Sequence, residues 1–246
     1  MMDLTKEHLI PVELLLRSVS HSKGALALFA PSKLTALAWS GHALVVGAVA
    51  TTVSWRAEVF GLVLVASISP MLFHLLSHPA LLRRRVRGGP VGEPDPRQKI
   101  IYSLMLLCSA GMAVVLSRDY ALGWSQVPVF IVLFGDVLIA AGLLLIWLVF
   151  RVNPFAAATV TVETEQPVIS RGLYALVRHP MYSGALLVLL GIPLALGSWW
   201  GLVLFPLYLV LIILRLTNEE RYLCAHLPGY QDYCARVTHR LLPFIW

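Results

Sequence analysis

Apolar and polar positions fall into long blocks along the chain. Four long apolar runs cover residues 34–53, 59–76, 100–116 and 127–150, and two runs of 16 residues cover 181–196 and 199–214. A helix of about 20 apolar residues crosses the ~30 Å hydrocarbon core of a bilayer. The pattern therefore predicts four full crossings. The last two runs, joined at Gly197-Ser198 and carrying Pro193 and Pro206, predict a short helical hairpin that spans thinly or is partly re-entrant.

Composition supports this interpretation. Apolar residues make up 58% of the 246 residues and charged residues only 13%, whereas soluble domains carry about 25% charged residues. The predicted fold is therefore an all-α, polytopic transmembrane bundle of about six helices. It divides into an N-terminal segment at 1–33, a four-helix region at 34–150 and a C-terminal unit at 151–246. Residues 1–33 are either an amphipathic helix on the membrane surface or a leader without fixed structure.

The placement of basic residues predicts the topology. The formal net charge is +6, and Arg and Lys concentrate in 83–99, in 151–180 and after residue 214. The links at 54–58, 118–126 and 197–198 carry little charge. The positive-inside rule then places both termini and the basic segments in the cytoplasm, in the inner or plasma membrane if the source is bacterial. The arginines at 83–87 are expected to set topology and attract anionic membrane lipid.

Cysteine and histidine positions predict neither disulfides nor a metal site. Cys108, Cys224 and Cys234 are few and scattered, so reduced thiols are expected. Cys224 and Cys234, taken with His226 and His239, fit no standard zinc spacing. No basic stripe with interleaved aromatic residues suggests nucleic acid as a partner.

Two polar segments flank the short hairpin, at 166–184 and 215–233. They meet at the cytoplasmic end of the bundle if the hairpin closes. Arg215 and Glu219 are four residues apart and share a helix face. His179 precedes Pro180, which disfavours helix at His179 and predicts a turn entering the next helix.

The order and spacing of these residues carry a family resemblance. The first segment reads Gly172-x-Tyr174-x-x-x-Arg178-His179-Pro180-x-Tyr182-x-Gly184, and the second reads Arg215-x-x-x-Glu219-Glu220 followed by Tyr230-x-x-Tyr233. This arrangement resembles the isoprenylcysteine carboxyl methyltransferase family, which belongs to a broader group with the phospholipid N-methyltransferases. The resemblance covers roughly residues 150–246. The four preceding apolar runs lie outside it, so substrate identity does not transfer.

The resemblance implies a cytoplasmic pocket for S-adenosylmethionine. Arg215 and Glu219 would be the catalytic residues: Glu219 would pair with the cationic donor, and Arg215 would meet the reacting group of the substrate. Two positions depart from the family pattern: Leu227 replaces a usual glycine, and an upstream polar contact falls loosely near Thr159. The cofactor-binding residues implied are Gln166, Val168, Ile169, Tyr174, His179, Pro180, Met181, Tyr182 and Glu219.

Methyl transfer from a sulfonium mainly requires that the reactants be positioned and desolvated. The expected function is an integral membrane methyltransferase acting on a lipophilic acceptor. An isoprenylcysteine-type carboxylate, another lipid acid and an amine are equally compatible acceptors. An amine or phenol acceptor would need a base to remove its proton, such as His179 or a tyrosine. A first alternative is an NADPH-dependent membrane reductase, because sterol reductases resemble this family in their C-terminal fold. A second is a non-catalytic lipid-binding or transport protein.

Simpler interpretations exist for the same residues. Arg215 with Glu219 could form a surface ion pair at the membrane boundary. Tyr230 and Tyr233 are expected as interfacial aromatic residues. Glu220 is expected to face solvent or cap the fold. Asp136, inside the fourth run, is expected either to meet a polar partner between helices or to line the acceptor cavity.

Overall fold

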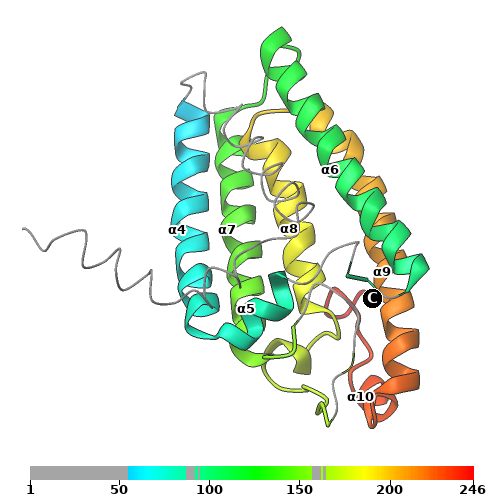
Figure 1. The fold of residues 1–246 in the computed structure, drawn as a ribbon. Coiled ribbons are helices and arrows are strands. Elements are labelled where there is room, and N and C mark those ends of the chain that lie inside the picture. Colours follow the sequence, from blue (N-terminus) through cyan, green and yellow to red (C-terminus); the bar gives the residue numbers. More distant parts are fainter. Residues whose placement is uncertain (1–54, 87–91, 94, 157–161, 163–164) are drawn as a thin grey trace, which may run out of the picture.

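The computed structural model describes residues 55–86, 92–93, 95–156, 162 and 165–246. The predicted segments 1–33 and 34–53 and the loosely matched Thr159 lie outside this part of the chain. The elements, shown in Figure 1, are α4 (Trp55–Ser77), α5 (Pro79–Val86), α6 (Pro96–Leu122), α7 (Val129–Val152), the 3₁₀ turn η1 (Gly172–Ala175), α8 (Pro180–Ala195), the 3₁₀ turn η2 (Trp200–Leu204), α9 (Phe205–His226) and α10 (Tyr230–Arg236).

The described chain is all-helical, and four of its helical segments are long and apolar enough to cross a membrane. These are α4, α6, α7 and the continuous segment Trp200–His226, while α8 is a shorter apolar helix. Large apolar side chains point outward from several of them: Leu62, Leu107 and Phe130 are each 69–70% exposed. Such surfaces suit contact with lipid. The multi-pass membrane architecture is confirmed, and the predicted total of six crossings stays a prediction.

The end of the hairpin differs from the prediction. The helix that carries the apolar run at 199–214 is longer than the run, because α9 continues through Arg215 and ends at His226. Pro206 stands in the first turn of α9, where its missing N–H leaves no hydrogen bond unmade. The helix extends past the apolar run, as the shared helix face expected for Arg215 and Glu219 requires, and arginine and glutamate are good helix formers. Likewise, Arg83 and Arg85 of the predicted connector lie on helix α5.

Helix α7 packs between α4 and α8, as Figure 1 shows. Two glycine pairs bring α7 and α8 together. A Cβ added at Gly142 would lie 2.5 Å from the Gly184 carbonyl oxygen, and one added at Gly135 would lie 2.9 Å from that of Gly191. Small residues allow this close backbone approach in membrane helices. The contact fixes the position of α8, whose first turn belongs to the candidate site.

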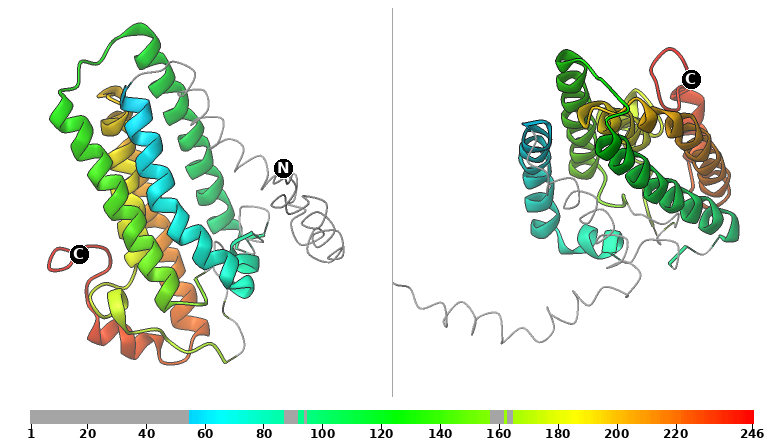
Figure 2. Two further views of the ribbon diagram at one scale, coloured as in Figure 1. Left: turned by 90° about the vertical axis from the view of Figure 1, so that its left-hand side faces the viewer. Right: turned by 90° about the horizontal axis from the view of Figure 1, so that it is seen from above.

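Helices α6 and α9 form a second layer (Figure 2). The Tyr208 hydroxyl of α9 donates to Ser109 Oγ of α6 at 2.6 Å. At the far end of the bundle the buried Asp119 accepts hydrogen bonds from Ser125 and from the Ser198 hydroxyl. These contacts tie the α6–α7 link to the turn after α8.

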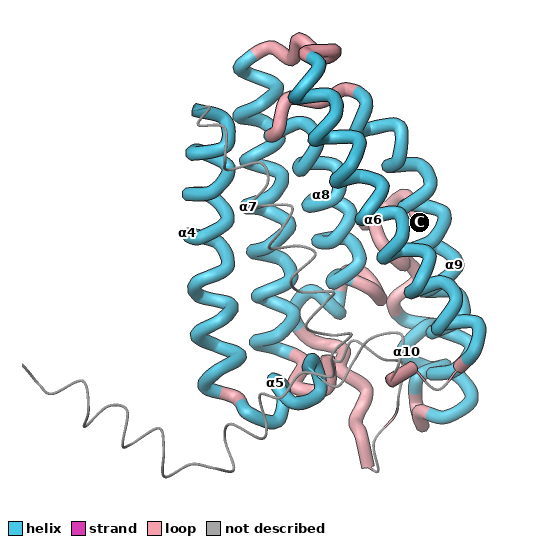
Figure 3. The backbone as a smooth tube through the Cα atoms, turned by 45° about the horizontal axis from the view of Figure 1, so that its top comes forward, coloured by secondary structure: helices cyan, strands magenta, loops and turns pink. Residues whose placement is uncertain are grey.

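The short elements gather at the opposite end of the bundle. Helix α5, η1, α10 and the chain after α10 all lie there, around the lower ends of the long helices in Figure 1, and the loops that join them are visible in Figure 3. Backbone hydrogen bonds tie this last segment to the start of α8: the N–H groups of Arg178 and His179 donate to the carbonyls of His239 and Arg240, each at 2.9 Å. The two polar segments of the sequence are thereby brought together.

Candidate active site

A cavity opens between the two polar segments at this end of the bundle. The space between its walls is about 810 Å³, counting the part open to solvent. Its lining residues are Asn153, Phe155, Ala156, Gln166, Pro167, Val168, Ile169, Tyr174, Arg178, His179, Met181, Tyr182, Glu219, Leu223, Leu227, Tyr230 and Tyr233.

Most residues predicted to bind the cofactor lie on this wall. Pro180 is buried at the start of α8 and does not line the cavity, and neither does Arg215. The structure thus brings together segments that are far apart in the sequence. The order of the motif residues along the chain suggested this proximity but did not establish it. The predicted residues on the wall are Gln166, Val168, Ile169, Tyr174, His179, Met181, Tyr182 and Glu219.

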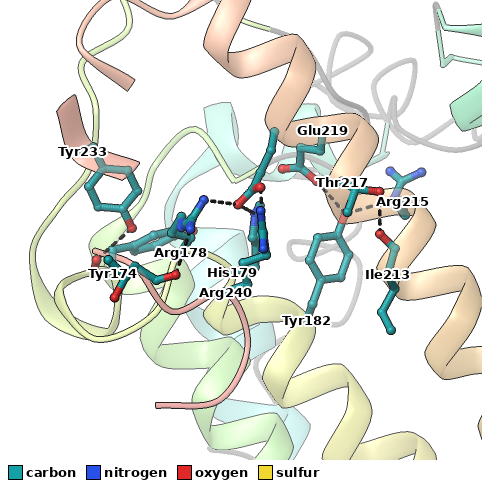
Figure 4. Close-up of polar contacts among 12 residues, drawn as sticks. Tyr174, Arg178, His179, Tyr182, Ile213, Arg215, Thr217, Glu219, Tyr233 and Arg240 are labelled. Carbon is teal, nitrogen blue, oxygen red and sulfur yellow. Dashed lines mark hydrogen bonds and ion pairs between the residues drawn. The ribbon is translucent and has the colours of Figure 1, made fainter. Parts of the chain in front are cut away.

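The Arg-His-Pro segment forms the predicted turn. His179 is the residue before α8, with φ −126° and ψ 60°, and Pro180 occupies the first turn of the helix. This agrees with the restriction that proline places on the residue before it. The turn points His179 and Tyr182 toward α9, which carries the glutamates of the site (Figure 4).

The Tyr182 hydroxyl joins the two predicted catalytic residues. It donates to Glu219 Oε2 at 2.6 Å and accepts from Arg215 Nε at 3.0 Å (Figure 4). Glu219 and Arg215 come from the same face of α9, as their spacing predicted. Tyr182 comes from α8 and lies between them.

Arg215 is only 5% exposed, so its interpretation as part of a surface ion pair is wrong. Its other partners come from the chain before and within α6. Gln98 Oε1 accepts from Arg215 Nη1 at 3.2 Å, and Glu93 Oε2 lies 3.6 Å from Nη2. The Arg215 guanidinium also lies over the Tyr102 ring, 5.1 Å from its centroid. These contacts join residues more than 110 positions apart, so no local pattern indicated them.

Glu220 does not face solvent as expected, because it lies at the centre of a buried ionic cluster. Arg178 Nη1 donates to Glu220 Oε1 at 2.8 Å, and Arg240 Nε donates to Oε2 at 2.9 Å. His179 Nε2 lies 3.3 Å from Glu220 Oε1. Glu220 thus fastens the Arg-His-Pro turn and the C-terminal segment to α9. The expectation failed because Arg240 and Arg178 reach this face of α9 only through tertiary folding.

Tyr230 and Tyr233 are buried and line the cavity, so their interpretation as interfacial aromatics is wrong. The Tyr233 hydroxyl donates to the Tyr174 carbonyl at 2.8 Å, and Asn153 Nδ2 donates to the Tyr174 hydroxyl at 2.9 Å. Burial raises the pKa of Tyr174 to about 12 and also raises the pKa values of Tyr230 and Tyr233. All three phenols are therefore neutral at physiological pH.

Several lining residues were missed by the sequence analysis. Asn153, Phe155 and Ala156 come from the end of α7 and the turn after it, and Leu223 lies one helical turn beyond Glu219. The spacing of Leu223 from Glu219 was a usable signal, since residues four apart share a helix face. Within the described residues, no group of three or more His, Cys, Asp or Glu side chains is placed to hold a metal ion.

Comparison with known proteins finds a family match over part of the chain. Residues 130–227 match the phospholipid methyltransferase family, which belongs to the isoprenylcysteine carboxyl methyltransferase-like group of membrane methyltransferases. The resemblance predicted from the motifs is therefore confirmed. A stretch of 105 residues is also 29% identical to Delta(14)-sterol reductase TM7SF2 of Mus musculus, covering 39% of this chain. That match spans only 25% of the length of the reductase.

Proposed function

We propose that this protein is an S-adenosylmethionine-dependent methyltransferase that acts on a lipophilic acceptor at the cytoplasmic surface of the membrane. The observation that carries the proposal is the Glu219 carboxylate on the wall of a cavity that the family's motif residues line. The match to the phospholipid methyltransferase family supports the same reaction class. Six crossings, cytoplasmic termini and the division at residues 33 and 150 remain part of this proposal.

The cavity suits the proposed cofactor in charge. Glu219 supplies a negative charge for a cationic donor, while Gln166 supplies a polar amide beside the apolar Val168 and Ile169. Tyr174 and Tyr230 add aromatic walls, and cations are attracted to aromatic faces. S-adenosylmethionine, when bound, supplies a methyl group already activated by its sulfonium.

The residues of the chain would then act by position and charge. Glu219 favours the positive donor, and Tyr182 holds the Glu219 carboxylate in place through its hydroxyl. Arg215, on the other side of Tyr182, orients the reacting group of the acceptor. A carboxylate acceptor already carries the electron pair that forms the new bond, so it needs no general base. His179 on the cavity wall would accept the proton from an amine acceptor.

An NADPH-dependent membrane reductase is the second candidate, and the partial identity to the mouse sterol reductase favours it. The phosphate groups of NADPH need cations. The Arg178 guanidinium on the cavity wall is held by Glu220 and the Thr238 carbonyl. Glu219 adds a negative charge to the same wall. The charges of this cavity therefore favour the methyl donor.

Ligand titration tests the proposal. Purified protein in detergent micelles is titrated with S-adenosylhomocysteine and with NADPH by calorimetry. We expect the homocysteine compound to bind, Glu219→Ala to abolish that binding, and the control Glu58→Ala, at an exposed site on α4, to keep it. Binding of NADPH alone would instead establish the reductase, and binding of neither would favour a lipid-binding or transport protein. Unchanged affinity in Glu219→Ala would refute the role of this carboxylate.

Mass spectrometry identifies the acceptor class. Membrane lipid extracts are incubated with the enzyme and an isotopically labelled methyl donor, and products heavier by one methyl group are sought. A labelled methyl ester would point to a carboxylate acceptor, and a labelled N-methyl group to an amine. No labelled product from any lipid fraction would count against a lipid acceptor.

A further inference from the structure

Arg85 extends from α5 toward Met181, a residue of the cavity wall. Helix α5 lies at the site end of the bundle (Figure 1). The Arg85 guanidinium lies 4.3 Å from the centroid of the Phe150 ring, and Nη2 lies 2.7 Å from the Met181 sulfur. Met181 belongs to the cavity wall, whereas Arg85 itself does not. Arg85 is therefore placed immediately behind the wall of the proposed donor cavity.

The Arg85 charge lacks an ionic partner among the described residues. Its Nε is shielded from solvent and has no hydrogen-bond partner there. The Glu219 carboxylate is close enough to act on its charge, yet none of the ion pairs in this part of the chain includes Arg85. Burial lowers the pKa of Arg85 to about 10, which leaves it charged at neutral pH. A partly buried cation outside any ion pair is costly, and near a membrane it usually marks a functional position.

A second guanidinium faces the same group of side chains. Tyr102 and Tyr182 both lie close enough to Arg85 to act on its charge. Arg215 lies over the Tyr102 ring and donates to the Tyr182 hydroxyl. Arg215 differs from Arg85 because it already has Glu93 as an ionic partner. Of the two guanidinium groups beside the same tyrosines, Arg215 thus forms an ion pair within the described residues and Arg85 does not.

We propose that Arg85 binds an anionic head group, a carboxylate or a phosphate ester, on the lipophilic acceptor. This inference rests on the proposed function and narrows its acceptor to lipids that carry a negative charge. Guanidinium groups bind carboxylate and phosphate through two parallel hydrogen bonds. Arg85 lies outside residues 130–227, which match the methyltransferase family. The part of the chain before that match would therefore select the acceptor.

The anionic group is assigned to the acceptor rather than to the donor because of the Met181 side chain. Met181 lines the donor cavity and contacts the Arg85 guanidinium from the other side. A donor in the cavity would thus be separated from Arg85 by the cavity wall. An acceptor group on the α5 side of Met181 would instead meet Arg85 directly.

The test compares charged and neutral probes on Arg85→Gln, with Arg83→Gln at an exposed position of α5 as the control. The probes are N-acetyl-S-farnesylcysteine with a free carboxylate and its uncharged amide, and dodecyl phosphate and dodecanol. Affinities are measured in micelles with S-adenosylhomocysteine present, and thermal unfolding verifies that each variant is folded. We expect Arg85→Gln to lower the affinity for at least one anionic probe about tenfold or more, since hydrogen bonds to charged groups are stronger than those between neutral groups. Neutral probes and the control variant should be unaffected.

Three results would overturn this assignment. The first is that wild-type protein binds neither anionic probe more tightly than its neutral partner. The second is that Arg85→Gln changes the affinities for charged and neutral probes equally. The third is that Arg85→Gln lowers the affinity for S-adenosylhomocysteine itself, which would place the anion on the donor. Failure of wild-type protein to bind S-adenosylhomocysteine at all would instead refute the proposed function, so the two failures are distinguishable.

Discussion

Glu219 and Glu220 are adjacent on α9, yet their carboxylates meet separate sets of partners. Glu219 accepts from the Tyr182 hydroxyl at the cavity wall, while Glu220 is held by Arg178 and Arg240. Consecutive residues of a helix point about 100° apart, which makes this division possible. One carboxylate is thus available to a ligand, and the other holds the chain around the ligand site.

Substitution of Glu220 should affect stability more than chemistry. Glu220→Gln leaves Arg178 and Arg240 without their charge partner, and breaking a buried ion pair costs about 3–5 kcal/mol. We expect a lower free energy of unfolding, measured by denaturant titration in micelles. Glu219→Gln is the matched variant: it should lose affinity for S-adenosylhomocysteine while keeping near-normal stability. Equal stability losses in both variants would contradict the division between the two residues.

The long-range architecture could be predicted from apolar run lengths, whereas helix ends could not. The runs at 59–76, 100–116 and 127–150 correspond to α4, α6 and α7. Helix α9 ends at His226 because Leu227 precedes Pro228 and takes an extended conformation, with φ −109° and ψ 107°. An apolar run indicates which part of a helix contacts lipid or the protein core, but not the residues at which the helix begins and ends.

The candidate site was predictable where its residues belong to one ordered motif. His179, Tyr182 and Glu219 lie together on the cavity wall, as their order and spacing suggested. Gln98 and Arg85 could not be found in this way, because their contacts depend on how α5 and α6 fold against the later helices. Contacts of this kind leave no periodic signal in a single sequence.

Loss of the Tyr182 hydroxyl should weaken donor binding. In Tyr182→Phe, Glu219 loses a hydrogen bond and so does the Arg215 Nε, and an unmade buried bond costs about 1–3 kcal/mol. We expect roughly tenfold weaker binding of S-adenosylhomocysteine together with lower thermal stability. Tyr208→Phe is the control, since its hydroxyl bonds to Ser109 away from the cavity. The control should lose stability alone, and an equal loss of affinity in Tyr208→Phe would contradict a specific role for Tyr182.

The buried phenol of Tyr174 predicts a loss of stability at alkaline pH. Its pKa rises from about 10 in an unfolded chain to about 12 in the fold. The unfolded state therefore releases this proton first, so stability is unaffected below about pH 10 and falls as the pH rises toward 12. Tyr174→Phe should show a shallower fall over this range, measured as unfolding free energy against pH. Identical slopes in both proteins would contradict the burial of this phenol.

The glycine pairs between α7 and α8 predict a packing defect that reaches the site. Gly142→Ala places a methyl group 2.5 Å from the Gly184 carbonyl oxygen and 2.8 Å from Val188 Cγ2, so the helices must separate. Overpacking of this kind costs about 1–3 kcal/mol.

Because α8 begins at the Arg-His-Pro turn, the same shift should also weaken S-adenosylhomocysteine binding by displacing Tyr182 from Glu219. Gly61→Ala on α4 is the matched control, since an added Cβ there meets nothing within 4 Å and alanine favours helix. Thermal unfolding and ligand titration of both variants in micelles are the measurements. We expect Gly61→Ala to be at least as stable as wild type, and an equal loss in both variants would show that the α7–α8 approach does not position the site.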